Sequence, residues 1–224
     1  MTFFPLLAIE TSSRAGSVAL MHDAQRIDER ALGEDAFQGR TLAPRIDALL
    51  KEHRITPDQI GLVAVGLGPG SFTGLRVGIA FARGFAYAVG CDMVGVSSLA
   101  ALALAEAGEK EEILCIGKAG HDEFFYASFR VDKGRIVSET EPAIDSLAVV
   151  QEKARSFKRA IGEGAAQLGS GAESISPAAG SVAVLGARLY AEEGPTPERR
   201  LLPLYLRRSN AEINWERRQG RSPG

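Results

Sequence analysis

Cysteine and histidine are scarce in this sequence of 224 residues. There are two cysteines and three histidines. Cys91 and Cys115 each lie beside an apolar run and not in a CxxC pair, so we expect two buried, reduced thiols. His22, His53 and His121 are far apart and form no HxxxH or HExxH motif. The sequence therefore predicts no metal site.

The chain also lacks an excess of either charge. Its net charge is −2 and its pI is about 6.0, which provides no strong field to hold a polyanion. Tight autonomous binding of nucleic acid is therefore not expected, and any contact with RNA would be local. The apolar fraction of 45% and the charged fraction of 24% are ordinary for a globular protein and argue against disorder or a fibrous repeat.

Long uncharged runs are absent as well. Arg76 and Arg83 interrupt the most apolar segment, so no stretch reaches the roughly 20 residues that a membrane span needs. The first residues lack a basic leader and a small-residue cleavage site, and Glu10 interrupts their apolar character. We expect no signal peptide, no membrane association and a cytoplasmic protein.

The common motifs of catalysis and nucleotide binding are missing too. Residues 61–90 contain no lysine, which excludes a P-loop there, and a Rossmann fingerprint starting at Gly68 has Thr73 in place of its last glycine. There is no GxSxG motif, and neither cysteine has a neighbouring histidine. The sequence therefore predicts no catalytic residue.

What the sequence does contain is a regular succession of strands and helices. The hydrophobic periodicity predicts an α/β protein of two lobes, in which the second lobe repeats the opening of the first. Residues 1–107 form the predicted first lobe, 108–207 a smaller second lobe and 208–224 a flexible basic tail. Strands are predicted at residues 5–11, 17–21, 26–31, 60–66, 93–96, 113–116, 123–131, 135–140 and 201–207, helices at 38–53, 71–89, 99–107, 146–157 and 182–193, and an exposed turn at 109–112.

The glycine-rich segment 66–74 is followed by a helix that is apolar on nearly all sides. Either the glycines form a tight turn with Ser71 or Thr73 capping the helix, or their backbone amides bind a phosphate group. Small residues form two rows along this helix, which allows close approach to another element. That element is either the core of the chain or another subunit. The rows are Gly74, Gly78, Ala82 and Ala86, and Ala80, Gly84 and Ala88.

A polar turn follows the first predicted strand. The hydroxyl groups and backbone amides of Thr11, Ser12 and Ser13 could hold a phosphate, although such residues are common in turns. Together with Gly68 and Gly70 they are the candidate cofactor-binding residues.

Three segments carry a resemblance to a known family. LLAIETSSRAGSVAL, VAVGLGPGSFTGLRVGIAFARGFAYAVG and MVGVSSLAALALA resemble the TsaB (YeaZ) family, and PLYLRRSNAE is similar to its C-terminal strand. The resemblance implies an actin-like ATPase fold (ASKHA, ribonuclease H-like) of two lobes, each with a mixed sheet flanked by helices. It further implies a role in forming N6-threonylcarbamoyladenosine on tRNAs that read ANN codons, together with the paralogue TsaD and the ATPase TsaE.

The resemblance also separates this chain from TsaD. TsaD carries a pair of metal-binding histidines where this chain has Ser98 and Leu102, and neither residue can replace an imidazole ligand. We therefore expect a non-catalytic scaffold that activates TsaD, forms a homodimer when alone and meets tRNA only through the complex. No cofactor is expected for the isolated chain, with ATP possible in the assembled complex. The expected partner interface comprises Leu42, Ile46, Leu49, Phe72, Gly74, Arg76, Val77, Gly78, Phe81, Ala82 and Phe85.

Two other functions stay open at this point. An autonomous actin-like ATPase or small-molecule kinase would use residues 10–13 and 68–74, and a metalloprotease is disfavoured because the histidine pair is missing. The second lobe also departs from the family pattern, since Lys118, Ala119 and Gly120 stand where an Asp-Ala-Arg turn is common. No role of that aspartate and arginine can be transferred to this chain.

Overall fold

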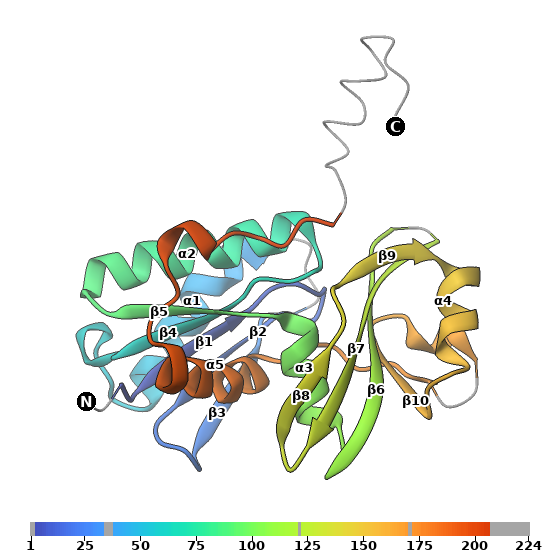
Figure 1. Ribbon diagram of the computed structural model, residues 1–224. Helices are drawn as coiled ribbons and strands as arrows, with labels where there is room; N and C mark the ends of the chain where they lie inside the picture. The colour runs from blue at the N-terminus through green and yellow to red at the C-terminus, as the bar shows by residue number, and fades with distance from the viewer. Residues whose placement is uncertain (1–2, 34–37, 121, 170–171, 207–224) are drawn as a thin grey trace, which may run out of the picture.

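The computed structural model describes residues 3–33, 38–120, 122–169 and 172–206, which form two sheets side by side (Figure 1). The first sheet has the strand order β3-β2-β1-β4-β5. Its first three strands are antiparallel neighbours, and β4 and β5 run parallel to β1. The strands are β1 (Leu6–Glu10), β2 (Ser17–Met21), β3 (Ile27–Ala31), β4 (Leu62–Gly66) and β5 (Asp92–Val96).

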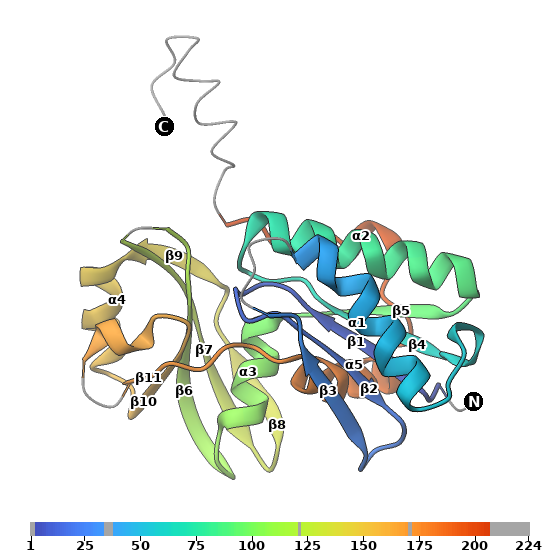
Figure 2. The same cartoon turned by 180° about the vertical axis from the view of Figure 1, so that it is seen from behind.

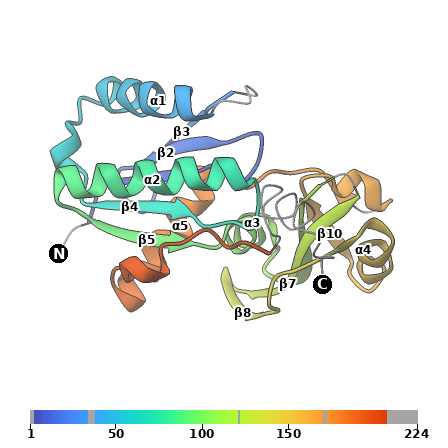
Figure 3. The same ribbon diagram turned by 90° about the horizontal axis from the view of Figure 1, so that it is seen from above.

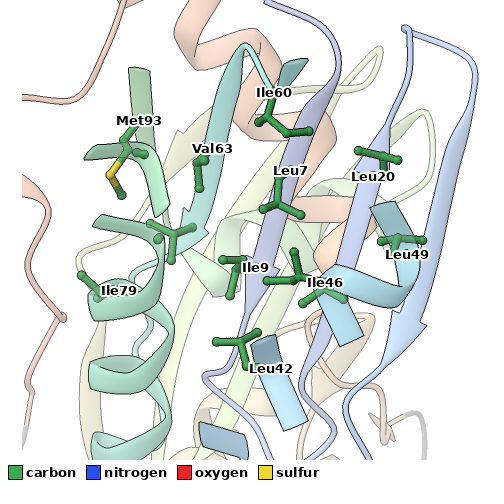
Figure 4. Close-up of a cluster of buried hydrophobic side chains, with 14 of the residues drawn as sticks. Leu7, Ile9, Leu20, Leu42, Ile46, Leu49, Ile60, Val63, Ile79 and Met93 are labelled. Carbon is green, nitrogen blue, oxygen red and sulfur yellow. The ribbon is translucent and has the colours of Figure 1, made fainter. Parts of the chain in front are cut away.

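Helices cover both faces of the first sheet (Figure 3). α1 (Gln38–Glu52) and α2 (Phe72–Val89) lie on one face, and α5 (Ala179–Glu193) lies on the other. Every residue of β1, β2 and β4 is buried, as expected for strands that pack on both faces. Because side chains alternate across a strand, Leu7 and Ile9 join the core beneath α1 and α2 (Figure 4), whereas Leu6 and Ala8 join the core against α5.

The second sheet repeats the pairing pattern of the first. Its order is β11-β10-β6-β7-β8, in which β6 takes the place of β1 and β10 that of β4. β9 pairs with β7 outside this path. The predicted repeat is therefore confirmed. The elements are β6 (Lys110–Lys118), β7 (Glu123–Asp132), β8 (Arg135–Glu139), β9 (Ala143–Ser146), α4 (Leu147–Ala154), β10 (Arg159–Gly162) and β11 (Ala172–Glu173).

Two helices cross between the lobes, which corrects the predicted boundaries. α3 (Ser98–Glu106) lies within the predicted first lobe, yet Leu99 and Leu102 pack against Ile113 and Phe129 of the second sheet. α5 lies within the predicted second lobe, yet it covers the first sheet. A division at residue 107 thus places each helix with the wrong sheet, because pattern along the chain does not show which sheet buries a helix.

Two local predictions are wrong, and a third is not tested by the described residues. The predicted turn at 109–112 is wrong, because β6 begins at Lys110 and pairs with the long strand β7. The predicted strand at 201–207 is wrong over its described residues: the segment is irregular, follows the 3-10 helix η3 (Glu198–Arg200), and contacts the first lobe through the Leu204 amide and the Leu67 carbonyl. The predicted tail at 208–224 lies outside the described residues. Two further 3-10 helices are η1 (Pro57–Gln59) and η2 (Ala165–Leu168).

The two thiols are unpaired, as predicted, but only Cys115 is fully buried, while Cys91 is half-buried. Burial raises the pKa of both thiols, which keeps them protonated near neutral pH. None of the helices in the described ranges combines the length and apolar character that a membrane span requires.

Two glycines of α2 provide a matched test of how closely this helix packs on the sheet. A Cβ atom at Gly78 would overlap Thr11 Oγ1, whereas a Cβ atom at Gly84 would meet nothing within 4 Å. We expect Gly78→Ala to lower the free energy of unfolding by about 1–3 kcal/mol through overpacking. Gly84→Ala should raise it by about 0.5–1 kcal/mol, because alanine favours a helix over glycine.

Denaturant unfolding of both variants measures this difference. Thr11→Ala in the Gly78→Ala background removes the overlapping hydroxyl and should restore part of the lost stability. Equal stability of Gly78→Ala and the wild type would contradict the close approach of α2 to β1.

Candidate functional site

A buried carboxylate occupies the point where the first sheet meets the second lobe. Glu10, at the end of β1, is fully buried. Its Oε1 accepts a hydrogen bond from the Ser12 amide at 2.6 Å, and its Oε2 accepts one from the Ser98 hydroxyl at 2.7 Å. The Ser98 oxygen in turn accepts the Gly68 amide at 3.2 Å. One side chain thus connects the end of β1, the glycine-rich turn and the start of α3.

The neighbouring strand leaves room for this carboxylate. A Cβ atom at Gly66 would overlap Glu10 Oε2, so only glycine fits at the end of β4. Burial raises the pKa of Glu10, and hydrogen bonds from Ser12, Ser98 and Thr11 partly oppose that rise. The acidic group at the end of β1 is therefore committed to internal hydrogen bonds and does not face solvent.

The glycine-rich turn packs on the loop after β1. The Ser71 amide donates to the Ser12 carbonyl at 2.7 Å, and a Cβ atom at Gly70 would overlap that carbonyl oxygen. Ser71 also caps α2, because its hydroxyl accepts the Gly74 amide at 3.2 Å. Of the two interpretations, the tight turn with a serine cap is confirmed. Phosphate binding by this turn stays a prediction.

A cleft of about 620 Å³ opens between the lobes. Arg14 and Lys118 bring positive charge to it, and both oppose the rise in the pKa of Glu163 that burial causes. Glu163 is the only carboxylate among the described residues that line the cleft. The lining residues are Ser12, Ser13, Arg14, Ser71, Lys118, Ala119, Gly120, Glu163, Gly164 and Gln167.

The predicted cofactor residues divide between this cleft and the packing beneath it. Ser12 and Ser13 line the cleft. Thr11 instead lies under α2 against Gly78, and Gly68 and Gly70 serve the turn. The altered turn at 118–120 does reach the cleft, so its lysine contributes charge there. No periodic pattern in the sequence predicts Arg14, Glu163 and Gln167, which come together only through the pairing of the two lobes.

The outer face of α2, defined here as Ala80, Gly84, Tyr87 and Ala88, is exposed to solvent. Tyr87 is 92% exposed, the largest value among the exposed apolar side chains of the described chain. The other small row of α2, from Gly74 to Ala86, is buried against the sheet. A helix with small residues on both sides therefore uses one row in the core and leaves the other uncovered.

The predicted partner interface needs a corresponding correction. Six of its residues are buried in the chain's own core and cannot contact a partner in this fold. The remaining five, Phe72, Arg76, Val77, Phe81 and Phe85, are partly or fully exposed, and for them the interface stays a prediction. Those in the core are Leu42, Ile46, Leu49, Gly74, Gly78 and Ala82.

The C-terminal segment covers one flank of α2. Arg76 lies over the ring of Phe72, 3.7 Å from its centre, and its Nε donates to the Tyr205 hydroxyl at 2.7 Å. Arg83 donates to the Glu198 carbonyl at 2.8 Å. These contacts hold the segment beside α2 and leave the outer face of the helix open.

The positions that correspond to the TsaD histidines are structural here. Ser98 belongs to the Glu10 hydrogen-bond network, and Leu102 is buried among second-lobe side chains. Neither side chain is available to bind a metal.

These features define the class of the protein. The chain has two sheets with the same repeated order, flanked by exchanged helices. Its residues 39–176 match the family model "TsaD: tRNA N6-adenosine threonylcarbamoyltransferase". An uncharacterized Pseudomonas aeruginosa protein described as similar to peptidase YEAZ has a crystal structure with a TM-score of 0.77 and 26% identity, over 90% of this chain and 99% of that one. The fold is thus the actin-like, TsaD-type α/β fold that the resemblance implied.

Named relatives identify the family of this chain within the TsaD-type fold. TsaB of Haemophilus influenzae is 30% identical over 70% of this chain and 66% of its own length, just under two thirds. TsaB of Escherichia coli is 27% identical over 96% of this chain and 99% of its own. Both are named tRNA threonylcarbamoyladenosine biosynthesis proteins. The chain belongs to the TsaB (YeaZ) family, as the sequence motifs indicated.

The burial of Glu10 can be tested through the pH dependence of the free energy of unfolding. Because burial raises the pKa of Glu10, the folded chain binds this proton more tightly than the unfolded chain does. Wild type should therefore lose stability relative to Glu10→Gln as the pH rises above the ordinary carboxyl value of 4.5. Below that value the difference between the two proteins should become constant.

Denaturant unfolding of both proteins across this pH range measures the effect. Glu163→Gln serves as a second carboxyl variant, since Glu163 is only half-buried and should show a smaller change. A difference between wild type and Glu10→Gln that does not vary with pH would contradict the burial of an ionisable group at this junction.

Proposed function

We propose that this chain is a non-catalytic partner subunit that works with TsaD and TsaE to form N6-threonylcarbamoyladenosine on tRNAs that read ANN codons. In this proposal it acts as a scaffold that activates TsaD, in the cytoplasm, and meets tRNA only through the complex. This proposal depends most on one observation in a chain of the TsaB family: the outer face of α2 is uncovered. That face comprises Ala80, Gly84, Tyr87 and Ala88.

The shape of this face suits a helix of another subunit. Small side chains let two helix backbones approach closely, and Tyr87 beside them offers a large aromatic group of the kind enriched at interface centres. In the absence of TsaD, two copies of the chain would pair through this same face and form the expected homodimer.

The residues at the junction of the two lobes favour a scaffold role for this chain over a catalytic one. Glu10 is enclosed by Ser12, Ser98 and Gly66, and the positions of the TsaD histidines hold a serine in that network and a buried leucine. We therefore propose that the isolated chain needs no cofactor and that any ATP belongs to the assembled complex. The peptidase likeness in the description of the Pseudomonas protein finds no support at these positions.

Reconstitution of the tRNA modification tests the proposal directly. Purified TsaD, TsaE and the remaining components should form threonylcarbamoyladenosine when this chain is present and lose that activity when it is omitted. Equal product formation with and without the chain would contradict the proposed role.

An interface variant tests the placement on α2. Gly84→Arg puts a long charged side chain on the outer face, where nothing lies within 4 Å of the added Cβ atom, so the fold should be kept. Association with TsaD should weaken by at least about tenfold, because the arginine blocks close helix approach. Size-exclusion chromatography of mixtures of the two proteins measures this loss.

Val137→Arg provides the matched control. Val137 is 50% exposed on β8 of the second sheet, far along the chain from α2, and its substitution adds the same charge. It should leave association unchanged. Normal association of a folded Gly84→Arg variant would refute the outer face of α2 as the docking surface.

The basic side chains of the interlobe cleft are the main support for the alternative function, an autonomous ATPase or kinase. Ser12, Arg14 and Lys118 at its walls are groups that could bind the phosphates of a nucleotide. Calorimetry of the isolated chain with Mg-ATP should show neither tight binding nor turnover under the scaffold proposal. Micromolar binding with hydrolysis would favour the autonomous ATPase or kinase instead.

A further inference from the structure

Two histidines that are far apart in the sequence meet at the end of the first sheet opposite the lobe junction. His22 directly follows β2, and His53 directly follows α1. The centroids of their rings are 4.6 Å apart, and the two ring planes make an angle of 65°. The pairing of Leu6 with Met21 and of Glu10 with Ser17 shows that this cluster and the interlobe cleft lie at opposite ends of β1. Seen from behind, α1 lies in front of this part of the sheet (Figure 2).

A carboxylate completes the group. Asp28 Oδ2 lies 3.1 Å from His22 Nε2 and 3.6 Å from His53 Nε2. One ligand atom from each of the three residues lies within 4.8 Å of the others. In a tetrahedral Zn²⁺ site with bonds of about 2.0–2.1 Å, neighbouring ligand atoms are about 3.3 Å apart. Two of the three distances are therefore close to those of a zinc site.

The backbone holds His53 in place. α1 ends in a Schellman motif, in which the Ile55 amide donates to the Leu50 carbonyl and the Arg54 amide donates to the Lys51 carbonyl. Arg54 has a φ of 56°, the left-handed conformation that this ending requires. His22 is fixed from the other side, since its amide donates to the Arg26 carbonyl across the β2–β3 turn. Both imidazoles thus project from fixed positions.

One imidazole nitrogen is enclosed without a hydrogen bond. His53 Nε2 is buried and has no hydrogen-bond partner, and Asp28 Oδ2 at 3.6 Å is too far to provide one. A buried polar atom of this kind is costly unless a ligand satisfies it. A metal ion between His53, His22 and Asp28 would do so.

We propose that His22, Asp28 and His53 form a binding site for a divalent transition metal, with Zn²⁺ as the ion that best suits two imidazoles and one carboxylate. The bound ion joins the β2–β3 turn to the end of α1. Asp28 is about a third exposed, which leaves water access to a fourth position.

Arg26 competes with the metal for these residues. Its Nε lies 3.6 Å from Asp28 Oδ2, and its NH2 group donates to His53 Nδ1 at 3.5 Å. A guanidinium only donates, so His53 in this arrangement carries its hydrogen on Nε2, the nitrogen that a metal needs free. Arg26 is 62% exposed and can move into solvent when the ion binds, whereupon the hydrogen of His53 lies on Nδ1.

Titration of the tag-free chain with Zn²⁺ at neutral pH, read by competition with a chromophoric chelator, tests the site. We expect one Zn²⁺ per chain and a loss of at least tenfold in affinity for His22→Ala and for His53→Ala. His121→Ala, which removes the third histidine of the sequence, should leave affinity unchanged. Arg26→Ala should bind more tightly than wild type, because the competing cation is gone.

A second measurement separates loss of Zn²⁺ binding from loss of the fold. Asp28→Asn keeps the shape of the side chain while weakening the ligand set, and its circular dichroism should match that of wild type. Zn²⁺ should raise the melting temperature of wild type and of His121→Ala but not that of Asp28→Asn. Absence of binding by wild type at submillimolar Zn²⁺, or equal affinity in wild type, His22→Ala and His53→Ala, would overturn the proposal. Loss of the tRNA modification role would leave this result unaffected.

Discussion

The fold depends on the enclosure of Glu10 at the end of β1. Its two oxygens hold the Ser12 amide and the Ser98 hydroxyl, so one carboxylate fixes the loop after β1 and the start of the helix that leads into the second lobe. Gly66 has no side chain because Glu10 fills that space. A charge is costly to bury unless hydrogen bonds satisfy it, and here the bonds to Glu10 come from the loop after β1 and from the start of α3. The network thereby links the end of β1 to α3, the helix that packs on the second sheet.

Close packing of α2 on the first sheet accounts for one of its two rows of small residues. Gly78 lets the helix approach Thr11, so one row brings α2 down onto a sheet whose β1 end is already fixed. The other row cannot serve this packing and faces solvent beside the exposed Tyr87. Since the C-terminal segment is held along one flank by Arg76 and Arg83, the outer face is the part of α2 left for another molecule.

Much of this structure was predictable because it depends on local pattern. The strands of the first sheet, the serine cap of α2 and the repeat of the lobes follow from apolar runs, turn residues and hydroxyl positions. Predictions failed where burial depends on distant partners. Leu42 was expected in the partner interface but packs in the core, α3 and α5 exchange sheets, and His22 meets His53 only after α1 returns across the sheet. Sequence spacing contains no signal for these contacts.

The central claim is that the outer face of α2 is the surface through which this TsaB-family chain meets its partner. Hydrogen–deuterium exchange of the chain alone and in complex with TsaD tests it most directly, because exchange reports which backbone amides become protected on binding. The account predicts that added protection centres on residues 72–89 and that the interlobe cleft, including 118–120, stays unchanged. Protection confined to the second sheet or to the cleft, with no change along α2, would contradict it.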